Sequence, residues 1–110
     1  MPDIVTTYAD MLRPIASGRQ ALTVDSTAGG VSLTVAAKAV FASCRLETAQ
    51  IRYTLDTTAP TTTVGWLLEV GETLELHGRY AMANFRAIRT GGSSGTLEVE
   101  YWRVDDGKSS

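Results

Sequence analysis

The sequence has one cysteine and one histidine among its 110 residues. A single thiol cannot form an internal disulfide, so the fold does not depend on an oxidising compartment. Cys44 lies in the apolar run AVFASCRL, where a buried thiol is expected. Together with His77 it is too little for a zinc site, and the acidic residues lack the spacing of a calcium loop. The sequence therefore predicts no metal and no cofactor.

Long hydrophobic runs and an excess of one charge are also missing. No segment approaches the roughly 20 apolar residues of a membrane span, and the chain does not start like a signal peptide. We therefore expect a protein that is made in the cytoplasm, is not secreted and does not enter a membrane. The formal net charge is −2, so the chain has no electrostatic attraction to phosphate backbones. Nucleic acid is not an expected partner.

Residue sets that perform catalysis are not apparent. His77, in the segment LELHGR, is unrelated in sequence to the only cysteine. Glu98 and Glu100 share one face of a predicted strand, where we expect cross-strand ion pairs with Arg52 or Arg86. The segments AGG and TGGSSG lack the lysine and the strand-to-helix context of a phosphate loop. We predict that the protein is not an enzyme.

The chain does contain a clear period-two pattern. About seven short apolar segments, spaced roughly eight to twelve residues apart and separated by Gly, Pro, Ser or Thr, predict antiparallel strands. This spacing favours a single all-β sandwich, Ig-like or jelly-roll-like, over residues 18–104. The two segments in which apolar and polar residues alternate most clearly are predicted to contribute their apolar side chains to one shared core. Its members are Ile51, Tyr53, Leu55, Leu97, Val99 and Tyr101.

Glycine-rich and threonine-rich segments predict the connections. STAGG is expected to close a hairpin between residues 22–24 and 31–35, and TGGSSG a second one between residues 83–89 and 96–102. The longer segment DTTAPTTTVG predicts a loop stiffened by Pro60 and by threonines that bond its own backbone.

Residues 1–17 read as an appendage, and residues 105–110 as a flexible tail. The appendage is either a short helix, from apolar spacings of three and four, or an extended arm, because several of its residues favour β geometry. In both cases its apolar side has no partner in the predicted sandwich, so we expect it to dock on another surface. That side comprises Ile4, Val5, Tyr8, Met11 and Leu12.

Two tryptophans are further interface candidates. Trp66 is expected in a loop, and Trp102 falls on the polar side of its strand. Large aromatic side chains at such places anchor interfaces. A sugar-binding site is an alternative interpretation. It would consist of Trp66, the threonine loop 57–63 and either Tyr80 or Trp102.

The stretch IRYTLDTTAPTTTVGWLLEVGETLEL, followed by FRAIRTGGSSGTLEVEYW, resembles a group of small virion proteins of tailed bacteriophages. Those proteins pair an RYTLDG-T-PT strand and loop with a glycine-bounded turn and a closing hairpin. The similarity covers most of residues 20–102. The YTLD..P part is also similar to the C-terminal β-sandwich module of chitobiases and other secreted glycosidases. Thr57 stands where these motifs carry glycine, which indicates a turn that does not freely take a positive φ.

The resemblance implies a non-enzymatic structural protein located in the virion. It implies a capsid decoration or cement protein that binds the outer surface of the head, with the major capsid protein or another virion protein as its partner. Such a protein is expected to be a homo-oligomer and to attach through many modest contacts. The alternative is a carbohydrate-binding β-sandwich module with a glycan as its ligand.

Overall fold

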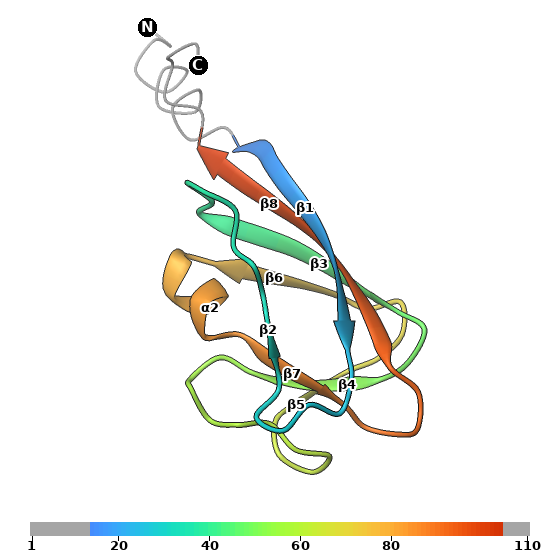
Figure 1. The fold of residues 1–110 in the computed structure, drawn as a ribbon. Helices are drawn as coiled ribbons and strands as arrows, with labels where there is room; N and C mark the ends of the chain where they lie inside the picture. Colours follow the sequence, from blue (N-terminus) through green and yellow to red (C-terminus); the bar gives the residue numbers. More distant parts are fainter. Residues whose placement is uncertain (1–13, 105–110) are drawn as a thin grey trace, which may run out of the picture.

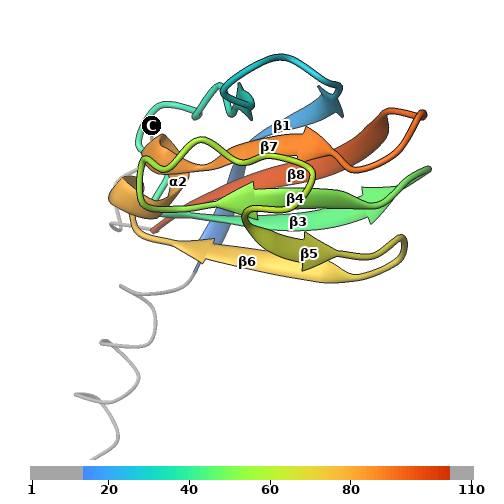
Figure 2. The ribbon, with the colours of Figure 1, turned by 90° about the horizontal axis from the view of Figure 1, so that it is seen from below.

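The computed structural model describes residues 14–104, which form two four-stranded sheets packed face to face (Figures 1 and 2). Sheet A has the strand order β1-β8-β3-β6, and sheet B has the order β2-β7-β4-β5. The strands of sheet A are β1 (Pro14–Val24), β8 (Gly95–Val104), β3 (Phe41–Glu47) and β6 (Thr73–His77). Those of sheet B are β2 (Val31–Ser32), β7 (Arg86–Arg89), β4 (Ile51–Thr54) and β5 (Trp66–Leu68).

Consecutive strands alternate between the two sheets, except β4 and β5, which are neighbours in sheet B. Every strand pair is antiparallel. Two sheets with this strand order make up an eight-stranded jelly roll, which is built from two Greek keys. The predicted all-β sandwich is therefore confirmed, and its topology is that of a jelly roll rather than an Ig-like domain.

Both predicted hairpins are wrong. β1 pairs with β8 whereas β2 pairs with β7, so the turn that contains Gly29 and Gly30 carries the chain from sheet A to sheet B. β7 and β8 likewise lie in different sheets. Gly29 and Gly30 have φ values of 85° and 86°, as a tight reversal requires. A reversal fixes only the local direction of the chain, and burial from both sheets decides which strands then pair.

Two element boundaries also differ from the sequence-based expectation. β1 begins at Pro14, so residues 14–17 belong to sheet A, with an irregularity in pairing between Ala16 and Gly18. The segment before β7 forms a short helix, α2 (Arg79–Asn84), and the strand starts at Arg86 rather than near residue 83. Alanine and methionine in RYAMAN favour the helix, and burial of Met82 holds it against the sandwich. The five apolar residues of the appendage lie outside the described residues, and so does the tail.

The core fills the space between the sheets, as the alternation predicted. Ile51, Leu97, Val99 and Tyr101 are buried, and Tyr53 and Leu55 are half-buried against them. Period two does not account for Thr54: the alternation with Tyr53 and Leu55 predicts that it faces solvent, yet it is 6% exposed. Its hydroxyl donates to the carbonyl of Thr58, at 2.5 Å, so the buried polar group is satisfied.

Candidate interaction surfaces

The two tryptophans do not share a surface. Trp66 begins β5 in sheet B and is 70% exposed. Trp102 lies in β8 on the outer face of sheet A and is partly buried. Ile4, Val5, Tyr8, Met11 and Leu12 were predicted to dock on another surface, and they lie outside the described residues. The sandwich therefore carries two separate candidate surfaces, one on each sheet.

The first surface is a row of rings on the outer face of sheet A, which we call the aromatic row: Trp102, Phe41 and His77. Phe41 lies opposite both other residues in the pairing of β3 with β8 and with β6. Its ring centroid is 5.8 Å from that of Trp102 and 5.4 Å from that of His77, with interplanar angles of 8° and 23°. Rings on adjacent strands come this close because the strands themselves are about 5 Å apart.

Polar contacts fix the two ends of the aromatic row. The indole Nε1 of Trp102 donates to Ser43 Oγ at 3.1 Å. At the other end, His77 Nε2 is 3.2 Å from Glu75 Oε1. The row is therefore a preorganised surface, half apolar and half polar, of the kind that anchors an interface.

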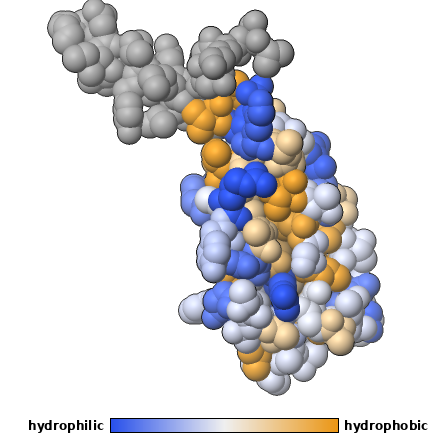
Figure 3. All heavy atoms as spheres, turned by 60° about the vertical axis from the view of Figure 1, so that its left-hand side comes forward, coloured by the Kyte–Doolittle hydropathy of each residue, from blue (hydrophilic) through white to orange (hydrophobic). Residues whose placement is uncertain are grey.

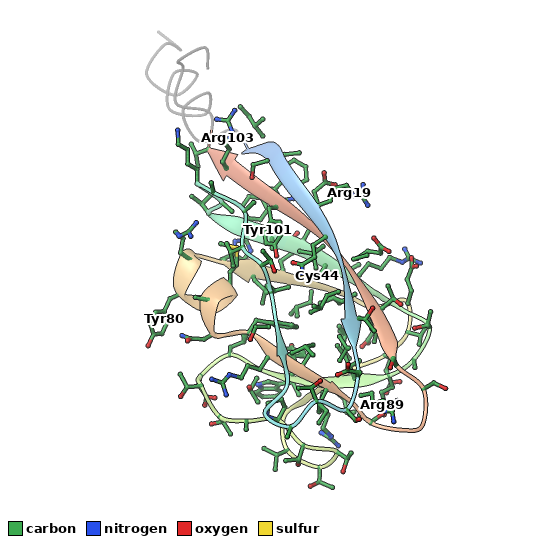
Figure 4. All side chains as sticks on the ribbon, viewed as in Figure 1. Arg19, Cys44, Tyr80, Arg89, Tyr101 and Arg103 are labelled. Atoms are coloured by element: carbon green, nitrogen blue, oxygen red, sulfur yellow. The ribbon has the colours of Figure 1, made fainter. Side chains whose placement is uncertain are left out.

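The aromatic row lies near the end of sheet A at which the described chain begins and ends. Pro14 pairs with Val104, and Ala16 pairs with Trp102. The same end has a hollow of about 420 Å³ whose lining includes the cations Lys38 and Arg103. Figure 4 shows Arg103 at this end. The predicted N-terminal appendage thus joins the sandwich beside the aromatic row.

Further along the same face the side chains are charged. Arg19 and Glu98 approach to 3.8 Å, and Arg45 lies opposite Glu98 in the pairing of β3 with β8. Arg52 and Arg86, the predicted partners of Glu98 and Glu100, are in sheet B, so that prediction is wrong. The ion-pair prediction failed because the hairpin prediction had already placed strands of both sheets on one face. Exposed ion pairs such as these contribute about 0.2–1 kcal/mol each.

The second surface is the β4–β5 loop with β5. The Arg52 guanidinium donates to the carbonyls of Thr62 (3.0 Å) and Gly65 (2.7 Å), so it ties the loop to the outer face of sheet B. The Thr61 hydroxyl accepts from the backbone N–H of Val64 at 3.0 Å. Pro60 is fully buried. As predicted, threonine and proline side chains hold this loop, although the role of Arg52 was not foreseen.

A groove of about 410 Å³ opens between the end of β4, the loop and the start of β5. Trp66 stands at its rim with Val64, and Thr54, Asp56 and Thr58 supply polar groups. The Asp56 carboxylate accepts from the backbone N–H of Thr58 at 3.1 Å, and this bond lowers the pKa of Asp56. An aromatic rim above a few polar groups is an arrangement that suits a small polar ligand.

Two exposed apolar residues in and after β5 were not predicted from the sequence. Leu67, next to Trp66, is 45% exposed, and Val70, in the turn that follows the strand, is 54% exposed. The run WLLEV has no period-two alternation, and that was the available signal that some of its apolar residues face solvent. On the face shown in Figure 3, hydrophobic residues form a broken band between polar ones.

The turn at Thr57 corrects the prediction made from the missing glycine. Thr57 does take a positive φ, 75°. A β-branched residue in this region is strained by about 1–2 kcal/mol. Thr57 thus adopts a conformation that glycine adopts without strain.

Replacing Thr57 with glycine should therefore raise the free energy of unfolding by about 0.5–1 kcal/mol, since relief of strain exceeds the added entropy of the unfolded chain. Urea denaturation measures the change. Thr48→Gly is a matched control: Thr48 also has a positive φ, 79°, but its hydroxyl donates to the Ser94 carbonyl at 3.0 Å. Loss of that bond should cancel the gain. A less stable Thr57→Gly protein would contradict the strain argument.

Cys44 is buried between the sheets, as the sequence indicated (Figure 4). Burial raises the pKa of its thiol to about 12. The same effect, together with the charge of Cys44, raises the pKa of Tyr101 to about 12, and the Tyr101 hydroxyl donates to Gln20 Oε1 at 2.7 Å. This thiol has neither the exposure nor the lowered pKa of a reactive nucleophile.

We expect Cys44 in the folded protein to resist a thiol reagent at pH 8 and to react fully in denaturant. In the unfolded chain its pKa is about 8.5, so only the unfolded state releases this proton as the pH rises above that value. The stability from this group is therefore complete below about pH 8.5 and falls as the pH approaches the folded-state pKa. Urea midpoints at pH 7 and pH 10 should differ more for the natural protein than for Cys44→Ala. Rapid labelling of folded protein would contradict the burial.

Within residues 14–104, no group of three or more His, Cys, Asp or Glu side chains is placed to hold a metal ion. No helix in this part of the chain has the length and apolar character to cross a membrane. Comparisons with family models, with curated proteins and with solved structures give no match to this chain. The function is therefore inferred from the fold and the two surfaces.

Proposed function

We propose that this protein is a non-enzymatic virion component of a tailed bacteriophage, which decorates the capsid by binding the outer surface of the head. The observation that carries the proposal is the aromatic row. Trp102, Phe41 and His77 form a preorganised, partly apolar surface on a solvated sheet face. A rigid aromatic surface with polar flanks is a common form of protein-binding site.

The position of the row supports this role. The appendage of residues 1–13, with its apolar side, enters the sandwich at Pro14, and Ala16 pairs with Trp102. In this proposal the predicted apolar segment, which precedes Pro14 in the sequence, and the aromatic row bind the same partner. The jelly roll is a fold found in viral capsid proteins, but also in lectins and enzymes, so it is compatible with the proposal without deciding it.

The test is co-sedimentation of the purified chain with phage heads assembled without it. We expect the chain to pellet with the heads, and we expect both Trp102→Ala and deletion of residues 1–13 to reduce the bound fraction. Trp66→Ala is the control, because Trp66 is 70% exposed in β5 of sheet B, whereas the row lies on sheet A. Melting curves confirm that each variant is folded. A chain that stays in the supernatant would contradict the proposal.

A carbohydrate-binding role is a second candidate, and it is favoured by the groove beneath Trp66. An exposed indole beside threonine and aspartate oxygens suits the apolar face and hydroxyls of a sugar. Titration with oligosaccharides, followed by tryptophan fluorescence, tests it. Saturable quenching that is lost in Trp66→Ala and kept in Trp102→Ala would support glycan binding, and no change with any sugar class would exclude it.

A further inference from the structure

The four edge strands of the sandwich are not equally protected against pairing with another chain. β1 carries the exposed Arg19 and an irregular register, β6 carries Glu75 and His77, and β2 has two residues. Charges, bulges and short length are the usual protections of an edge. β5, Trp66–Leu68, is also short, but it has no charge, proline or bulge, and two of its side chains are exposed. Figure 2 shows β5 at the free edge of sheet B.

We propose that β5 pairs antiparallel with β5 of a second copy of this chain, about a two-fold axis at Leu67. Leu67 then lies opposite Leu67 of the second copy, and Trp66 lies opposite Leu68. The exposed side chains of Trp66 and Leu67 both lie in this pairing, and each position meets its own symmetry partner, as an isologous interface requires.

Charges around β5 are complementary in the same register. Glu69 lies opposite Gly65 of the second copy, and the Gly65 carbonyl accepts from Arg52 NH1 at 2.7 Å. Arg52 and Glu69 belong to the same outer face of sheet B, because Arg52 pairs with Leu67 and Gln50 Nε2 donates to Glu69 Oε2 at 2.8 Å. Each Glu69 therefore faces the Arg52 of the other copy. No carboxylate opposes a carboxylate across these paired positions.

The pairing joins two B sheets into one sheet of eight strands and removes the unprotected edge. It does not depend on the proposed virion role, since it uses sheet B and leaves the aromatic row of sheet A free in both copies. With a strand of three residues on each side, the association is weak and depends on concentration.

Sedimentation equilibrium of the full chain, from about 1 µM to 1 mM, tests the dimer. We expect reversible dimerisation by the natural protein. Leu67→Lys places two like charges directly opposite at the axis and should weaken the dimer at least about tenfold. Tyr80→Lys adds the same charge at an exposed site on α2 and should leave the dimer unchanged. A natural protein that stays monomeric throughout, or a Leu67→Lys dimer of unchanged strength, would overturn the proposal.

The register has its own test. Because Cys44 is buried, Leu67→Cys introduces an accessible thiol next to its symmetry copy. With oxidised glutathione present, we expect this variant to form a covalent dimer by thiol–disulfide exchange, and Tyr80→Cys to remain monomeric on a non-reducing gel. Absence of the covalent Leu67→Cys dimer under conditions in which the natural protein dimerises would place the interface elsewhere.

Discussion

Replacing Leu97 with alanine should lower the free energy of unfolding by about 2–5 kcal/mol. Leu97 is fully buried, and it lies opposite Leu22 of β1 and Leu46 of β3 in sheet A. The shorter side chain buries less apolar surface and leaves a cavity. The surrounding strands are held by their pairing in the sheet, so they cannot move in to close it. Domains of this size are commonly stable by about 5–15 kcal/mol, so the loss would be a large share of the total.

Urea denaturation of the Leu97→Ala protein measures this loss. Val40→Ala is the control, since Val40 is 36% exposed and its truncation should change stability by no more than about 0.5 kcal/mol. Equal effects of the two substitutions would show that Leu97 does not face the core.

Replacing Gly95 with alanine is the second substitution with a large expected effect. Gly95 begins β8, and an added Cβ would lie 2.6 Å from the Ala49 carbonyl oxygen and 2.8 Å from Ile51 Cγ2. These distances are too short for real contacts, and the nearest atom is backbone that cannot rotate away. We expect destabilisation of about 1–3 kcal/mol, as for other overpacked sites.

The same loop provides the control for Gly95→Ala. An added Cβ at Gly92 would meet nothing within 4 Å. Gly92→Ala should therefore be neutral, or stabilising by a few tenths of a kcal/mol through the unfolded state. Thermal melts of the two variants show whether close packing or backbone flexibility is the reason that glycine occupies these positions. A stable Gly95→Ala protein would show that the β3–β4 turn can shift.

Strand positions were predictable from the sequence because burial in a strand has a local period of two. Ile51 with Tyr53, and Leu97 with Val99, were assigned to the core on that basis and lie in it or against it. Pairing was not predictable in the same way. A glycine turn looks the same whether the next strand joins the same sheet or the facing one, and in this chain nearly every connection changes sheets.

The candidate surfaces were predictable only in part. Trp66 and Trp102 stood out because large aromatic residues occur at polar positions of the pattern. The aromatic row did not, because Phe41, His77 and Trp102 are far apart in the sequence and meet only through the pairing of β3 with β6 and β8. The anchoring of the loop by Arg52 depends likewise on the antiparallel return of β5 along β4.

β8 lies in the interior of sheet A, between β1 and β3. It is made after every other described strand, and β1, the first of them, has no neighbour in sheet A until then. A chain that has been translated only as far as residue 94 holds β1 and β3 with the strand between them missing. Such long-range pairing folds slowly and leaves apolar strands uncovered in the meantime. We therefore expect the sandwich to form only once β8 has been made, and β1 to stay unpaired in sheet A until that point.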